Sequence, residues 1–210
     1  MAENIIPLIK ICGMTREADA VRAIELGAQA IGMLFYEKSP RFVSTPQASA
    51  IAHAVGIGGL KVGLFVDPDS GTVKEVLDAV PLDILQFHGS ELAEFCGSFG
   101  LPYWKTLRAK DPASLPGLAG EYPEAAGILL DTWHPTKAGG TGETFDWSML
   151  DDLELTQHLI LAGGLKPGNI RTAINQVQPW AVDVCSGVES SPGIKSVQLM
   201  KQFIEEVRRV

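Results

Sequence analysis

Short runs of apolar and β-branched residues recur along the chain at regular intervals. The first reads LIKIC at 8–12 and the last reads AVDVC at 181–185. Near-continuous apolar runs of this length are typical of strands buried on both faces, as in a parallel sheet. The pattern predicts eight strands, at 8–12, 30–35, 61–66, 83–88, 103–107, 127–131, 158–162 and 181–185.

Helical patterns separate these runs. In 16–26, for example, apolar residues stand at 18, 21, 24 and 26, and Gly, Pro or Ser marks the junctions. After 127–131 the sequence GGTGETFDWSMLDDL predicts only a short or degraded helix. The other helices are expected at 16–26, 46–56, 72–79, 90–98, 112–120, 168–177 and 195–209.

Eight strand–helix units in series predict how the sheet closes. Parallel strands need crossover connections, and no linker or change of composition interrupts the series. The simplest arrangement is a (β/α)8 TIM barrel that forms a single catalytic domain over residues 1–210. The alternative is an open doubly wound sheet, which commonly carries a GxGxxG turn after its first strand, where this chain reads CGMTRE at 12–17.

Composition and charge narrow the classes of partner. With 17 Lys and Arg against 25 Asp and Glu, the formal charge of −8 repels nucleic acid and anionic membranes. No apolar stretch reaches the roughly 18 residues that a membrane span needs, and the first residues do not resemble an export signal. Cys12, Cys96 and Cys185 lack metal-ligand spacing, which argues against a disulfide scaffold or a zinc site. We expect a cytoplasmic protein with reduced thiols.

Active sites of such barrels lie at the carboxyl ends of the strands, so polar residues there are candidates. Cys12 could act as a base near Lys10 and a helix start capped by Thr15, or it could be an ordinary buried thiol. Asp131 closes an apolar strand, where burial favours the protonated acid, or it could cap a loop. Two further candidates are Asp183, as a substrate ligand or half of an ion pair, and His88, as a titrating or hydrogen-bonding group.

Two features suggest how an anionic ligand would be held. Arg41, on the loop after the second strand, could grip a carboxylate with its forked guanidinium, or it could simply be solvated. The loops after the last two strands, AGGLKPGNI and SGVESSPGIK, are glycine-rich, as in the recurrent phosphate site of such barrels. A further GGTG at 139–142 suits either a lid or an anion cradle. The candidate phosphate ligands are Gly163, Gly164, Ser186 and Gly187.

A series of motifs follows the order of a known family. Its members are KICGMT at 10–15, SPRFV at 39–43, VGLFVD at 62–67, LQFHG at 85–89, LLDT at 129–132, GGTGETFDW at 139–147, LAGGL at 161–165 with Pro167 and Asn169, and DVCSGVESSPGIK at 183–195. Together they resemble the phosphoribosylanthranilate isomerases, which are (β/α)8 enzymes of tryptophan biosynthesis. The chain departs from the family's usual residues at Phe87, Cys185 and Ser196; the first two lie near the expected site, and Ser196 near the start of the last helix.

The resemblance implies an Amadori rearrangement of N-(5-phospho-β-D-ribosyl)anthranilate without metal or redox cofactor. It implies that Cys12 is the general base and Asp131 the general acid. Arg41 would bind the anthranilate carboxylate, the two glycine loops would bind the phosphate, and Asp183 would lie near the substrate's hydroxyls. His88 is a further candidate for substrate binding. The expected partner is this small phosphorylated substrate, with the protein a monomer or homodimer.

Three other functions remain open from sequence. A related isomerase of histidine biosynthesis would be expected to carry a carboxylate in place of Cys12. A cysteine hydrolase would combine Cys12 with His88 and Asp131. A non-catalytic phosphosugar-binding protein would tolerate replacement of both Cys12 and Asp131.

Overall fold

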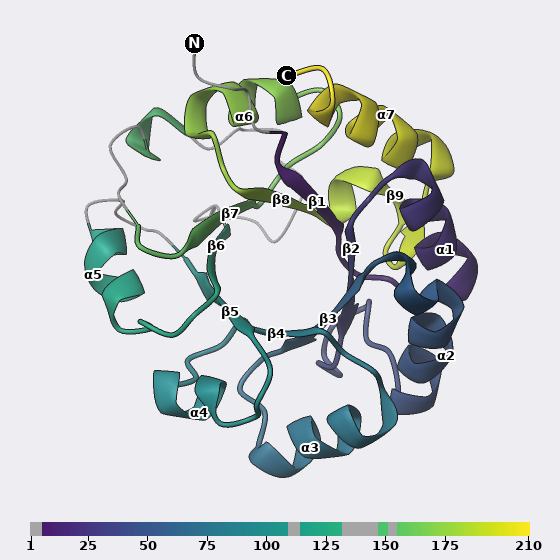
Figure 1. Cartoon of the computed structure of the whole chain (residues 1–210). Helices are drawn as coiled ribbons and strands as arrows, with labels where there is room; N and C mark the ends of the chain where they lie inside the picture. Colours follow the sequence, from purple (N-terminus) through teal and green to yellow (C-terminus); the bar gives the residue numbers. More distant parts are fainter. Residues whose placement is uncertain (1–5, 109–113, 132–146, 151–154) are drawn as a thin grey trace.

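Eight parallel strands close into a barrel in the order of the sequence (Figure 1). The computed structural model describes residues 6–108, 114–131, 147–150 and 155–210. Each predicted strand is present, with both ends within one residue of the prediction, and the (β/α)8 barrel is confirmed. The strands are β1 (Leu8–Ile11), β2 (Ala30–Leu34), β3 (Leu60–Phe65), β4 (Ile84–Phe87), β5 (Tyr103–Leu107), β6 (Gly127–Asp131), β7 (His158–Ala162) and β8 (Ala181–Val184).

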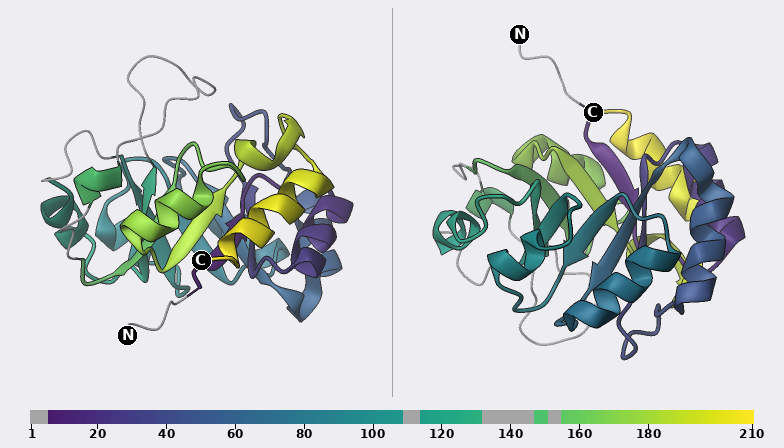
Figure 2. Two further views of the ribbon diagram at one scale, coloured as in Figure 1. Left: turned by 90° about the horizontal axis from the view of Figure 1, so that it is seen from above. Right: turned by 60° about the horizontal axis from the view of Figure 1, so that its bottom comes forward.

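Helices cover the outside of the barrel, and α7 packs against both α1 and α6 (Figures 1 and 2). The α-helices are α1 (Glu17–Leu26), α2 (Thr45–Val55), α3 (Ser70–Ala79), α4 (Ala93–Gly97), α5 (Leu115–Gly120), α6 (Ile170–Val177) and α7 (Val197–Val207). Short 3-10 helices are η1 (Gly56–Gly58), η3 (Trp147–Leu150) and η4 (Ser186–Val188). None of the helices in the described ranges combines the length and apolarity that a bilayer crossing needs.

Local chemistry explains where several helices begin. Asp69 accepts a hydrogen bond from the Thr72 amide, so α3 begins two residues before the predicted 72. Ser196 caps α7 by accepting from the Leu199 amide, which agrees with its expected effect on that helix. The prediction for Thr15 was wrong: α1 has Arg16 at its N-cap, and the Thr15 hydroxyl donates instead to the Gly193 carbonyl.

Two other segments differ from the prediction. Helix α4 is shorter than the expected 90–98 because Glu91 turns toward the preceding loops, where its carboxylate accepts from the amides of Asp67 and Gly89. Between β8 and α7 the chain forms an unpredicted antiparallel pair, β9 (Glu189–Ser191) and β10 (Ile194–Lys195). After β6, the described part contains only the short helix η3, while the GGTG motif lies outside the described residues.

The apolar core has two layers. The larger layer lies between the strands and the surrounding helices. The smaller layer fills the barrel from the start of the strands up to the floor of the cavity described below and includes Trp104, with Trp180 packed beside it. Apolar side chains therefore plug one end of the barrel, which leaves the opposite end for polar groups.

Candidate active site

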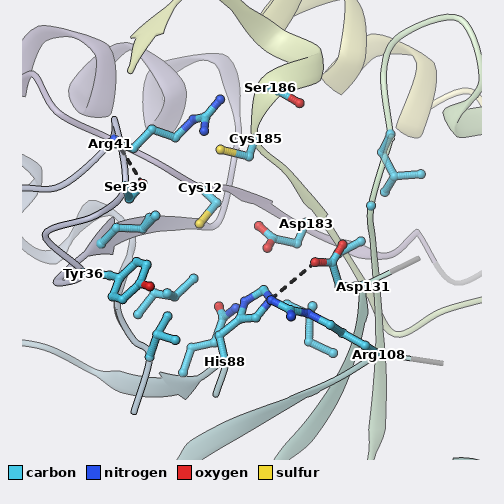
Figure 3. Close-up of a pocket in the computed structure, with 18 of the residues that line it drawn as sticks. Cys12, Tyr36, Ser39, Arg41, His88, Arg108, Asp131, Asp183, Cys185 and Ser186 are labelled. Carbon is cyan, nitrogen blue, oxygen red and sulfur yellow. Dashed lines mark hydrogen bonds and ion pairs between the residues drawn. The ribbon is translucent and has the colours of Figure 1, made fainter. Parts of the chain in front are cut away.

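A cavity of about 590 Å³ opens at the carboxyl ends of the barrel strands (Figure 3). Each strand contributes to its lining either its own last residue or the residue that follows it. In strand order these residues are Cys12, Leu34, Val66, His88, Arg108, Asp131, Ala162 and Cys185. A ligand in this cavity can therefore touch side chains from every strand.

Cys12 lies at the end of β1 and is almost fully buried, at 4% exposure. A hydrogen bond from the Cys185 thiol favours its thiolate; burial opposes the charge, whereas Lys10 and Lys195 support it. The combined effect lowers the pKa of Cys12 to about 7. A substantial fraction of this thiol is therefore ionised near neutral pH, as a general base requires.

Lys10 and Asp183 form a buried ion pair beneath Cys12. They face each other in the β1–β8 register, with 2.9 Å between Nζ and Oδ1. Burial alone would lower the pKa of Lys10, but the negative charges of Asp183 and Cys12 outweigh it and raise that pKa. Asp183 thus combines both of the roles considered for it, since it belongs to an ion pair and also lines the cavity.

Two glycines make room for the sulfur atoms. A Cβ at Gly32 would lie 2.7 Å from Cys12 Sγ, and a Cβ at Gly13 would lie 2.8 Å from Cys185 Sγ and 2.7 Å from Arg41 Cδ. Gly13 also has a φ of +76°, which side chains other than glycine rarely adopt. The positions of both cysteines and of Arg41 therefore depend on having glycine, with no side chain, at positions 13 and 32.

Arg41 is held by an acidic residue from the far end of the chain. Its Nε and Nη2 atoms donate to the two oxygens of Glu189, at 2.8 and 2.7 Å. Lys195 Nζ also donates to Glu189, at 2.9 Å. Burial would raise the pKa of Glu189, but these two cations outweigh it and hold the pKa below its usual range. One edge of the guanidinium is thus fixed inside the protein.

These residues form what we call the base half of the site, which comprises Cys12, Arg41, Cys185, Glu189 and Lys195. They come from the loops at the ends of β1, β2 and β8 and from β9 and β10. Lys195 connects Glu189 to Cys185. Besides its bond to Glu189, its Nζ donates to the Cys185 carbonyl at 3.1 Å and lies 3.8 Å from the Cys185 sulfur.

The opposite side of the cavity, which we call the acid half, comprises His88, Arg108 and Asp131. His88 Nε2 lies 3.3 Å from Asp131 Oδ2, and the Asp131 side chain is 34% exposed. Figure 3 shows Arg108 alongside His88 on this side of the cavity. His88 therefore pairs with Asp131, whereas the groups that favour the Cys12 thiolate are a thiol and two lysines.

The two glycine-rich loops meet at the cavity rim. Gly163 and Gly164 line it with φ angles of +82° and +64°, and Ser186 lines it from the neighbouring loop. Gly187 is not among the lining residues; a Cβ there would lie 1.9 Å from the Leu165 carbonyl oxygen. Gly187 thus allows the two loops to touch.

Comparisons with known proteins agree with this geometry. The family model for N-(5'-phosphoribosyl)anthranilate (PRA) isomerase matches residues 9–206. The chain belongs to this family. The isomerase of Pseudomonas aeruginosa strain LESB58 is 50% identical over 200 residues, which cover 95% of this chain and 94% of that protein. That of Cellvibrio japonicus is 48% identical, with 93% and 91% covered.

Solved PRA isomerases share the whole barrel. The crystal structure from Thermotoga maritima has a TM-score of 0.90 at 37% identity and covers 97% of this chain and 100% of its own. A second solved isomerase, in complex with reduced 1-(o-carboxyphenylamino)-1-deoxyribulose 5-phosphate, has a TM-score of 0.84 at 34% identity, with 97% and 100% covered.

Several residues that line the cavity or support its side chains were not predicted from the sequence. Arg108 follows a predicted strand directly, so the rule that selected His88 and Asp131 would also have found it. Tyr36 and Ser39 lie on the Arg41 loop, where the Ser39 hydroxyl accepts from the Arg41 amide at 3.1 Å. Glu189 and Lys195 stand in the motif at 183–195, but no local pattern marked them as neighbours of Arg41, because only barrel closure brings them together.

Proposed function

We propose that this chain catalyses the Amadori rearrangement of N-(5-phospho-β-D-ribosyl)anthranilate to 1-(2-carboxyphenylamino)-1-deoxy-D-ribulose 5-phosphate. The observation that carries the proposal is the pairing of a thiol with a lowered pKa, Cys12, and a carboxyl group, Asp131, in one cavity. Membership of the PRA isomerase family supports the same reaction.

The cavity suits the two anionic ends of this substrate. Glu189 occupies one edge of the Arg41 guanidinium, and the outer edge can receive the anthranilate carboxylate through charge-assisted hydrogen bonds. The phosphate would bind between Gly163, Gly164 and Ser186, where two loops converge. An acidic protein would then hold a multiply charged anion by local contacts rather than by its net charge.

The reaction requires an acid and a base at different atoms of the sugar. Protonated Asp131 delivers a proton to the ring oxygen as the C1–O bond breaks, and the anilino nitrogen supplies the electrons that form an iminium ion. The Cys12 thiolate then removes the proton at C2, which gives an enolamine that tautomerises to the ketone. Each such transfer contributes about 10²- to 10⁴-fold to the rate.

Neighbouring groups act on both residues. Lys10 and Lys195 stabilise negative charge on Cys12 before it takes the proton. His88, 3.3 Å from Asp131, orients that carboxyl group, and Asp183 can accept a hydrogen bond from a sugar hydroxyl. We propose that the protein works in the cytoplasm as a monomer or homodimer. In either state one chain supplies the described cavity lining.

Anthranilate fluorescence tests the proposal. Substrate made in situ should lose its fluorescence when the protein is added, and Cys12→Ala or Asp131→Asn should slow this loss by at least about 10²-fold. Cys96→Ala is the matched control, because Cys96 is buried outside the cavity. Unchanged turnover in both active-site variants would refute the assigned roles. Release of a covalently bound acyl group from Cys12 would instead indicate a hydrolase.

A further inference from the structure

The catalytic thiol has a second cysteine directly beside it. Strands β1 and β8 are paired so that Ile11 faces Val184, and the Cys12 amide donates to the Val184 carbonyl at 2.8 Å. Cys12 and Cys185 are the next residues on these two strands. Their side chains enter the same cavity (Figure 3), and the Cys185 thiol is the largest cause of the lowered pKa of Cys12.

The spacing of the two backbones suits a covalent bond between these sulfurs. Neighbouring strands lie about 4.7–4.9 Å apart. Disulfides span Cα–Cα distances of about 4.4–6.8 Å, so residues in register on adjacent strands fall inside this range. Both sulfurs also occupy space that Gly13 and Gly32 leave open. Because the Cys12 amide is already hydrogen-bonded to the Val184 carbonyl, we expect the bond to form by side-chain rotation, with β1 and β8 still paired.

The charges around the pair divide the chemical roles between the two thiols. Cys12, with a pKa lowered to about 7, supplies the nucleophilic thiolate. The hydrogen bond to Cys12 raises the pKa of Cys185, as does its burial, so Cys185 keeps its proton. Lys195 Nζ lies 3.8 Å from the Cys185 sulfur, where its charge can stabilise that sulfur when it attacks.

We propose that Cys12 and Cys185 form a redox-sensitive modification site, in which a peroxide converts the two thiols to a reversible intramolecular disulfide. The Cys12 thiolate attacks one oxygen of the peroxide, the O–O bond breaks, and Cys12 becomes a sulfenic acid. The hydroxide that leaves takes up the proton that Cys12 released on ionisation and forms the first water. Cys185 then attacks the Cys12 sulfur, the S–O bond breaks, and the leaving oxygen departs as water with the Cys185 proton. Two thiols are oxidised by two electrons, and one hydrogen peroxide is reduced to two waters.

The remaining cysteine is an internal reference. Cys96 is fully buried in the outer core, and burial raises its pKa to about 11. A thiol with little thiolate and no access reacts slowly with peroxides. Oxidation should therefore consume Cys12 and Cys185 and leave Cys96 as a thiol.

Peptide mapping tests the proposal without relying on activity. The full-length protein is treated with equimolar hydrogen peroxide, its remaining thiols are alkylated, and it is digested with trypsin. We expect residues 11–16 linked to residues 172–195, because trypsin cleaves after Lys10, Arg16, Arg171 and Lys195. A dithiol should separate the two peptides. A main product that carries Cys12 sulfinic acid, with no linked peptide, would overturn the proposal.

Activity measured against each variant's own starting rate gives the second readout. In the wild type, a dithiol should restore lost turnover, since the disulfide protects Cys12 from further oxidation. In Cys185→Ser, Cys12 should pass to sulfinic acid, and the loss should become irreversible. Cys96→Ala is the control and should behave as the wild type. If the loss of turnover were equally irreversible in the wild type and in Cys185→Ser, the proposal would be overturned.

The two proposals can fail separately. A linked peptide in a protein that lacks isomerase activity would refute only the proposed function.

Discussion

The two halves of the cavity are built by different means. In the base half, Glu189 binds both Arg41 and Lys195, and its side chain is only 4% exposed. In the acid half, the pair between His88 and Asp131 spans 3.3 Å, and Asp131 is 34% exposed. The base half is thus fixed by buried charges, while the acid half is more exposed to solvent. The buried ion pairs of Glu189 therefore lie on the side of the cavity where the Cys12 thiolate is stabilised.

The largest effect should come from breaking the buried charges under the base half. Lys10→Met leaves Asp183 as a buried carboxylate without its partner, so the free energy of unfolding should fall by about 3–5 kcal/mol. Lys201→Met is the matched control, because Lys201 pairs with Glu205 on the surface and should change it by less than about 1 kcal/mol. Urea denaturation measures both. Equal losses would show that the base half is no more interlocked than the surface.

The second-largest effect should come from filling the space that Gly32 leaves beside the Cys12 sulfur. Gly32→Ala places a methyl group 2.7 Å from Cys12 Sγ, so the thiol has to move and kcat should fall by about 10²-fold. Gly117→Ala is the control, since a Cβ there would meet nothing within 4 Å. Steady-state turnover compares the two variants. A wild-type kcat for Gly32→Ala would mean that the thiol tolerates displacement.

Substitutions in the two halves should change different kinetic constants, and Glu189→Gln tests this in the base half. Weakening the support of Arg41 should raise KM by about tenfold, the equivalent of one charge-assisted hydrogen bond, with little change in kcat. His88→Asn, in the acid half, should instead lower kcat because it releases Asp131. Steady-state kinetics separates the two cases. Glu206→Gln is the control, because Glu206 also pairs with arginines but lies outside the cavity. A fall in kcat alone for Glu189→Gln would remove Arg41 from substrate binding.

The smallest effect concerns pH. In the proposed mechanism the base is the ionised form of Cys12, so kcat/KM should rise with pH through a midpoint of about 7. Cys185→Ala removes the hydrogen bond that most strongly lowers this pKa, and the midpoint should move upward. Profiles are measured with dithiol present to keep the thiols reduced, and Cys96→Ala should leave the midpoint in place. An unchanged midpoint in Cys185→Ala would contradict this account of the thiolate.

The positions of the strands, and of the cavity residues at or near their carboxyl ends, were predictable from the sequence because strand periodicity is a local pattern. Alternation alone placed Cys12, His88, Asp131 and Asp183 at strand ends that face one cavity. The contacts that tune these residues depend on barrel closure, which no local pattern encodes. Arg41 and Glu189 lie 148 positions apart, and the Cys12–Cys185 neighbourhood exists only because β8 pairs with β1.

The contact at Gly187 has a consequence for how the anion pocket can evolve. Because a Cβ at Gly187 would collide with the Leu165 carbonyl, the loops after β7 and β8 leave no room between them for a side chain at this position. A side chain gained at position 187 would push both walls of the pocket apart at once. The two walls therefore have to change together, and sequence variation in one should be matched by compensating variation in the other.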